Sequence, residues 1–84
     1  MQTKYDFNQI SADAKSAIAT AFKGSAVSVE EGWHGRVHMK VVSEAFNGQT
    51  EKQKQKAVWD VLRKKLKAEA TGISLVLVYG LDEI

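Results

Sequence analysis

An apolar run near the C-terminus, residues 73–79, most constrains how this chain can fold. Its sequence, Ile-Ser-Leu-Val-Leu-Val-Tyr, is rich in residues that favour strands, and apolar side chains occupy nearly every position. A strand of this kind is expected to be covered on both faces. Because it follows a long helical pattern, the run predicts a right-handed crossover and a parallel pair with an earlier strand.

Two earlier segments are the expected partners of this strand. Residues 26–30 and 36–42 alternate with period two, so that Val37, Met39 and Val41 share one face of the second segment. The connection between the two segments contains two glycines. The pair is therefore predicted to form an antiparallel hairpin.

A first helix is predicted in the N-terminal part of the chain. Ile10, Ala14 and Ile18 recur at helical spacing within residues 10–22. Residues 1–9 are expected to form a loose N-terminal extension.

A second helical region is predicted after Thr50. Thr50 and Gln53 have the spacing of a capping box, in which each side chain satisfies a backbone amide at the start of a helix. The region is expected to end near Ala70, before Gly72. Its first turn is a candidate for a separate short helix. The apolar stripe consists of Val58, Val61, Leu62 and Leu66.

These elements predict an α+β fold in a single domain over residues 1–84. The chain has 84 residues, which is enough for one domain and too few for two. The predicted order is α-β-β-α-α-β, with a three-stranded mixed sheet. Since three strands alone cannot bury a core, the helices are expected to pack together on one face of the sheet.

The composition of the chain excludes several classes of function. The chain has no cysteine, which excludes disulfides, thiolate metal sites and cysteine nucleophiles. No nucleophile–base set, phosphate-binding loop or zinc motif is present. No apolar run approaches the ~20 residues that span a bilayer, and the N-terminus lacks the apolar core of a signal peptide. We therefore expect a cytoplasmic, non-enzymatic binding module that does not contact membranes.

Positive charge is concentrated in the second helical region. Residues 51–67 carry seven basic and two acidic side chains, whereas the whole chain has a net charge of only +2. Such a local field indicates an anionic partner, although a solvated helix face gives the same pattern. The candidate binding residues are Lys52, Lys54, Lys56, Arg63, Lys64 and Lys67.

The segment at residues 41–48, Val-Val-Ser-Glu-Ala-Phe-Asn-Gly, resembles the signature of the BolA family. That signature is a valine-rich strand ending in Val-Ser, then two residues, Phe, one residue and Gly. The resemblance extends over roughly residues 12–80, and it implies the class II KH-like fold of BolA proteins. The family's Arg-His-Arg triplet corresponds here to Lys54-Gln55-Lys56.

The resemblance implies a regulator or adaptor that binds a monothiol glutaredoxin in iron–sulfur or stress-related regulation. In the family, a shared [2Fe-2S] cluster is held by a loop Cys or His and by a histidine at the start of the last strand. His34 matches the loop position, but Ser74 replaces the second histidine. A neutral hydroxyl is a poor iron ligand beside imidazole. His34 is thus either a retained cluster ligand or an exposed loop histidine without a role.

Three functional interpretations remain open. The first is the glutaredoxin-binding adaptor, with Trp33 at the loop tip as a candidate partner anchor. The second is a DNA- or RNA-binding transcriptional regulator that uses the basic helix, residues 52–67. The third is a diverged protein that binds only another protein. A monomer or a weak dimer is expected in each case.

Overall fold

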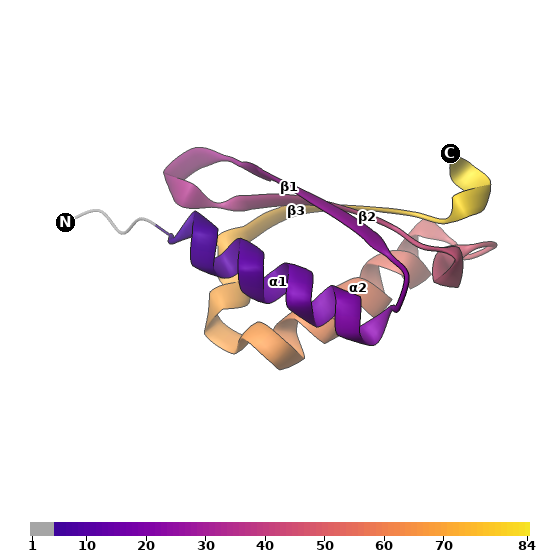
Figure 1. Ribbon diagram of the computed structural model, residues 1–84, viewed down its shortest axis with the longest axis horizontal. Coiled ribbons are helices and arrows are strands. Elements are labelled where there is room, and N and C mark those ends of the chain that lie inside the picture. The colour runs from indigo at the N-terminus through magenta and orange to yellow at the C-terminus, as the bar shows by residue number, and fades with distance from the viewer. Residues whose placement is uncertain (1–4) are drawn as a thin grey trace.

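The computed structural model describes residues 5–84, which form a three-stranded sheet with two α-helices on one face (Figure 1). The elements are α1 (Phe7–Ala21), β1 (Ala26–Glu31), β2 (Val37–Val42), α2 (Glu51–Leu66) and β3 (Ile73–Tyr79). The strand order is β1-β2-β3, with β2 antiparallel to β1 and parallel to β3. The predicted α+β class and mixed sheet are therefore confirmed.

Helix α1 begins earlier than the sequence pattern predicted. The Asp6 side chain accepts a hydrogen bond from the Gln9 amide at 3.1 Å and caps the helix, so that Phe7 is its first residue. Tyr5 and Phe7 also pack against the core. The expected loose extension is therefore wrong for residues 5–9, whereas residues 1–4 lie outside the described part.

Helix α2 has the predicted start but ends sooner than expected. Thr50 and Gln53 form both hydrogen bonds of the capping box, at 2.9 and 3.2 Å. At the other end, Lys67 adopts a positive φ of 55°, and the chain continues as a 3₁₀ segment over Lys67–Gly72. The region thus contains one α-helix with a 3₁₀ turn before it and a 3₁₀ segment after it, whereas two helices were expected.

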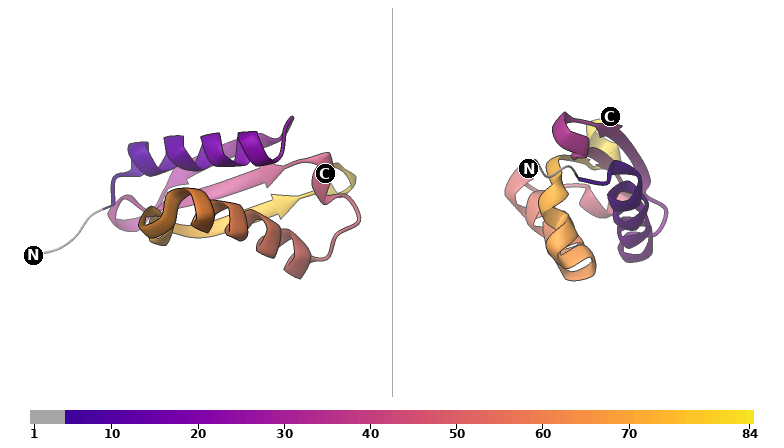
Figure 2. Two further views of the ribbon diagram at one scale, coloured as in Figure 1. Left: turned by 90° about the horizontal axis from the view of Figure 1, so that it is seen from below. Right: turned by 90° about the vertical axis from the view of Figure 1, so that its left-hand side faces the viewer.

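The two helices lie side by side on the same face and run in opposite directions (Figure 2). Apolar side chains from both helices meet the inner face of the sheet, and burial of each large one is worth about 1.5–3 kcal/mol. The buried residues include the β2 face that the sequence predicted, which consists of Val37, Met39 and Val41. They also include Ile10, Ile18, Val58, Leu62, Val76 and Val78.

The opposite face of the sheet is not covered by any element within residues 5–84 (Figure 2). Leu75 and Leu77 of β3 are 44% and 41% exposed on this face. The expectation that the last strand is covered on both faces is therefore wrong. The reason is that both helices pack on the inner face, so that within residues 5–84 no element remains to cover the outer face of β3.

No helix among residues 5–84 is both long and apolar enough to cross a membrane.

Candidate functional site

The connection between β1 and β2 is a short, well-bonded tip. Residues Trp33–Gly35 form one 3₁₀ turn, and the Gly32 amide donates to the Arg36 carbonyl at 2.8 Å. The Tyr5 amide donates to the His34 carbonyl at 2.7 Å, which ties the tip to the start of α1. His34 itself has φ 56° and ψ 32°, in the left-handed region that side-chain-bearing residues seldom occupy.

The tip presents two aromatic rings to solvent. The Trp33 side chain is 82% exposed, and its ring centroid lies 5.7 Å from that of the exposed His34. An exposed tryptophan on a hydrogen-bonded loop can enter a partner's pocket with little loss of chain entropy. The exposure of Trp33 leaves its ring accessible to a partner, and its role as a partner anchor stays a prediction.

Gly32 leaves room beside the tip for the His38 ring, and this close approach could not be predicted from the sequence. A Cβ atom at Gly32 would lie 2.7 Å from Nε2 of His38, closer than side-chain carbons approach other atoms. Gly32 directly follows β1, and His38 lies on the facing strand β2. Only the hairpin register, with Glu31 opposite Val37, brings the two together.

Ser74 lies at the same end of the sheet as the tip. In the parallel pair, Val37 is opposite Ile73 and His38 is opposite Leu75, which leaves Ser74 as the extra residue of a β-bulge. Because the tip immediately precedes β2, the topology brings His34 and Ser74 to one edge of the molecule. The two positions that the BolA resemblance singles out are thus brought to the same end.

The donor atoms at these positions do not match the two-ligand set of a shared [2Fe-2S] cluster. His34 offers an imidazole, but Ser74 offers only a neutral hydroxyl, which binds iron poorly. Within residues 5–84, no group of three or more His, Cys, Asp or Glu side chains is placed to hold a metal ion.

The basic side chains of α2 divide into exposed and buried groups. Lys54, which was predicted to bind an anionic partner, is 2% exposed and points into the molecule. Its assignment to the binding surface is therefore wrong. Lys56 is exposed but forms an ion pair with Asp60 at 2.6 Å. The remaining exposed cations of this predicted surface are Lys52, Arg63, Lys64 and Lys67.

Lys54 joins α2 to the C-terminal 3₁₀ turn. Its ammonium donates to both carboxylate oxygens of Glu83, at 2.8 and 2.9 Å, and lies 3.3 Å from Glu51. The hydrogen bond from Lys54, together with the Gly80 amide, lowers the pKa of Glu83 below its usual 4.5, and the same contact with Glu83 raises the pKa of Lys54 above 10.5. Lys54 is therefore a structural cation.

The C-terminal turn also holds the loop before α2. The Gly48 amide donates to Asp82 at 2.9 Å, and the Asp82 amide donates to the Asn47 side chain at 3.2 Å. Phe46, in the same loop, is buried with its ring centroid 4.9 Å from that of Phe22. Thus the segment that resembles the BolA signature is anchored by its aromatic residue and by backbone contacts.

Gln55, at the position of the BolA triplet histidine, ties α2 to the edge of the sheet. Its side-chain amide donates to the Val76 carbonyl at 2.8 Å, and its oxygen accepts from the Trp59 indole at 3.1 Å. Arg63 stacks over the same indole at 5.3 Å. The residue therefore satisfies backbone and side-chain groups between α2 and β3, and it does not belong to a free polar surface.

Comparisons with known proteins place this architecture among known folds. No protein-family model matches the sequence, and no curated protein matches it. Among solved structures, BolA1 from Arabidopsis thaliana superposes with a TM-score of 0.69 at 16% identity, covering 89% of this chain and 95% of that one. The BolA domain of SufE1 from Arabidopsis thaliana gives a TM-score of 0.65 at 20% identity, covering 84% and 91%. The chain therefore has a BolA-like fold.

Proposed function

We propose that this chain is a non-enzymatic, BolA-like adaptor that binds a monothiol glutaredoxin through the β1–β2 tip, without supplying a second cluster ligand. The BolA-like fold supports the choice of partner. The observation that carries the proposal is the placement of Trp33 and His34 at the same end of the sheet as Ser74. This end combines an exposed aromatic anchor with a position from which the family histidine is missing.

The tip is ordered before binding, which favours a protein partner. The hydrogen bonds at Gly32, Arg36 and Tyr5 hold the turn, so binding orders few additional torsions. An indole of this exposure buries a large apolar area when it enters a pocket, and tryptophan is enriched among residues that dominate binding energy. Most of the affinity is therefore assigned to Trp33.

Calorimetric titration of the purified chain with a monothiol glutaredoxin tests the interface. Trp33→Ala is expected to weaken binding roughly thirtyfold, since a dominant anchor contributes about 2 kcal/mol. Lys15→Ala is the matched control, because Lys15 is exposed on α1 and outside the tip. Binding that is unaffected by Trp33→Ala, or absent from the unaltered chain, would contradict the proposal.

The second part of the proposal concerns the cluster. When glutaredoxin, iron and sulfide are supplied together, the absorption and circular dichroism spectra are expected to remain those of the glutaredoxin's own cluster. Ser74→His adds the missing imidazole at an exposed position and should produce a new mixed-cluster spectrum that His34→Ala abolishes. A mixed cluster on the unaltered chain that survives His34→Ala would show that the ligands lie elsewhere.

The structure does not favour nucleic-acid binding by α2. Of the six cations predicted to form that surface, Lys54 is buried and Lys56 is paired with Asp60. Of the four exposed cations that remain, Lys52, Arg63 and Lys64 lie on α2, and Lys67 begins the 3₁₀ segment that follows it. Nucleic-acid binding therefore stays a prediction from charge alone, to be tested by the salt dependence of probe retardation.

A further inference from the structure

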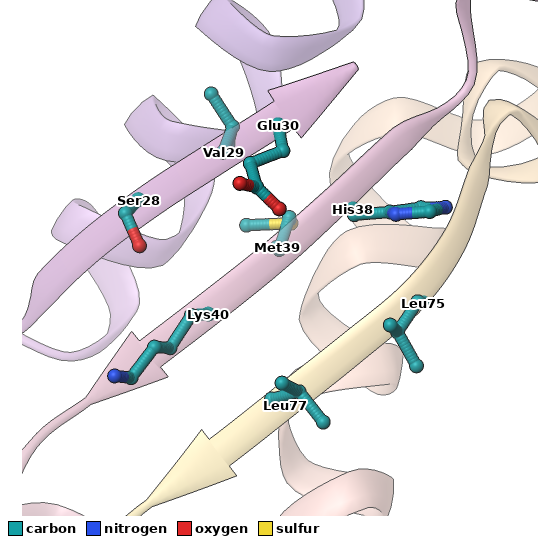
Figure 3. A pocket seen from close by; sticks show the side chains of 8 residues that line it. All are labelled: Ser28, Val29, Glu30, His38, Met39, Lys40, Leu75 and Leu77. Carbon is teal, nitrogen blue, oxygen red and sulfur yellow. The ribbon is translucent and has the colours of Figure 1, made fainter. Parts of the chain in front are cut away.

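The open face of the sheet is a regular grid of nine residues. Each row crosses the three strands, because the register places Glu30, His38 and Leu75 in line, then Ser28, Lys40 and Leu77, then Ala26, Val42 and Tyr79. Figure 3 shows this face from outside, with the helices behind the sheet. A shallow hollow on it is lined by residues from all three strands.

One column of the grid is apolar and exposed to solvent. Leu75 and Leu77 are 44% and 41% exposed, and Tyr79 continues the same column at half burial. From Leu75 to Tyr79 the column spans roughly 13 Å at about 3.3 Å per residue. Contiguous apolar residues on a sheet that carries helices on its other face mark a surface suited to a partner.

The centre of the grid carries the positive charge of Lys40, which forms no ion pair with any of residues 5–84. The Lys40 ammonium lies 5.5 Å from the centre of the Tyr79 ring, and the ion pairs within residues 5–84 involve only Lys54 and Lys56. Glu30 is the only carboxylate on the grid, and it lies at a corner, one row and one strand away from Lys40. A partner that presents an acidic group near the middle of this face would therefore complement the Lys40 charge.

We propose that the open face binds an amphipathic helix of a partner protein, whose apolar stripe covers Leu75, Leu77 and Tyr79 and whose carboxylate pairs with Lys40. Three strands about 4.8 Å apart are roughly 10 Å wide, which matches the diameter of one helix. The apolar column corresponds to about two and a half turns at 5.4 Å per turn. The inner face of the same sheet is covered by helices in a comparable way.

The charge distribution distinguishes such a helix from a second copy of this chain. A two-fold packing of two open faces about their centres would bring Lys40 close to its own copy, and like charges in a buried contact are unfavourable. An acidic helix meets Lys40 with the opposite charge. This surface includes neither Trp33 nor His34, so the inference does not depend on glutaredoxin binding.

The test uses two synthetic 18-residue helical peptides with the same leucine stripe, flanked by glutamate in one and by lysine in the other. Each is titrated into the isotope-labelled chain, and amide chemical shifts are recorded. The glutamate peptide is expected to shift amides of Ser28, His38, Lys40, Leu75 and Leu77, with at least tenfold higher affinity than the lysine peptide.

Variants separate this face from other basic surfaces. Lys40→Glu should reverse the preference between the peptides, and Leu77→Ser should weaken both. Lys64→Glu, on the exposed face of α2, is the matched control and should change neither affinity. Shifts confined to α2 or to the tip, no shifts at all, or loss of peptide binding through self-association seen by sedimentation would overturn the proposal. Far-UV circular dichroism checks that each variant is folded.

Discussion

Replacement of Gln55 by alanine removes the side-chain link between α2 and the edge of the sheet. In the native chain, the Gln55 side chain contacts the Val76 carbonyl at 2.8 Å, the Trp59 indole at 3.1 Å and Glu51 at 3.1 Å. The Glu51 contact is exposed and contributes little. The other two involve groups that are partly withdrawn from water, so their loss determines the effect.

The magnitude follows from these two contacts. Each hydrogen bond contributes about 1 kcal/mol net to the free energy of unfolding, so that their loss costs about 2 kcal/mol. Alanine forms helices better than glutamine by roughly 0.4 kcal/mol, which offsets part of this cost. Gln55→Ala should therefore destabilise the chain by about 1.5 kcal/mol. For a domain of this size, that lowers the melting temperature by roughly 6–12 °C.

Urea unfolding followed by circular dichroism and by tryptophan fluorescence measures this effect. Fluorescence is informative because Trp59 loses a hydrogen-bond partner and should become more exposed in the variant. Lys64→Ala, at an exposed site on the same helix, is the control and should change stability by less than about 0.5 kcal/mol. If Gln55→Ala is as mild as this control, the link to β3 is not a stabilising contact.

Three further predictions concern stability and shape. The Lys54–Glu83 pair stabilises the fold above pH 4.5, and this stabilisation is lost as the pH falls through the lowered pKa of Glu83. The free energy of unfolding should therefore fall less on acidification in Glu83→Gln than in the unaltered chain. Equal pH profiles of the two proteins would contradict this. Gly32→Ala should displace the His38 ring, visible as a large shift of its imidazole resonances, whereas an unchanged spectrum would show that the tip is not tightly packed. Phe46→Ala should cost about 3–5 kcal/mol in urea unfolding, and a loss below 1.5 kcal/mol would mean that the loop readily collapses into the space.

The elements that could be predicted from sequence are those specified by local patterns. The alternation in β2 gave its buried face, and the Thr50–Gln53 spacing gave the start of α2. The start of α1 was missed although Asp6 is a standard capping residue and Phe7 lies at helical spacing before Ile10 and Ala14. The cap and the apolar spacing read together indicate the start at Phe7.

The features that could not be predicted depend on contacts between distant parts of the chain. Lys54 follows the helical pattern of an edge residue, and only the return of Glu83 to the first turn of α2 shows that it is buried. Similarly, Leu75 and Leu77 have the composition of a covered strand, yet their side chains are exposed because none of the elements described between residues 5 and 84 packs on the open face. An apolar residue type indicates that a side chain favours burial, but it does not specify which neighbouring element covers that side chain.

The two positions at which the chain departs from the BolA histidines have different structural meanings. Gln55 forms hydrogen bonds to Val76 and Trp59 that hold α2 against β3, so its replacement has a structural consequence. Ser74 is exposed in a β-bulge, where its side chain supports no buried contact, and bulges commonly redirect side chains beside functional sites. A histidine can therefore be introduced at Ser74 at little cost to the fold, whereas a change at Gln55 alters the packing of α2. This difference makes Ser74→His the more direct test of whether the tip has lost only a ligand and kept its partner.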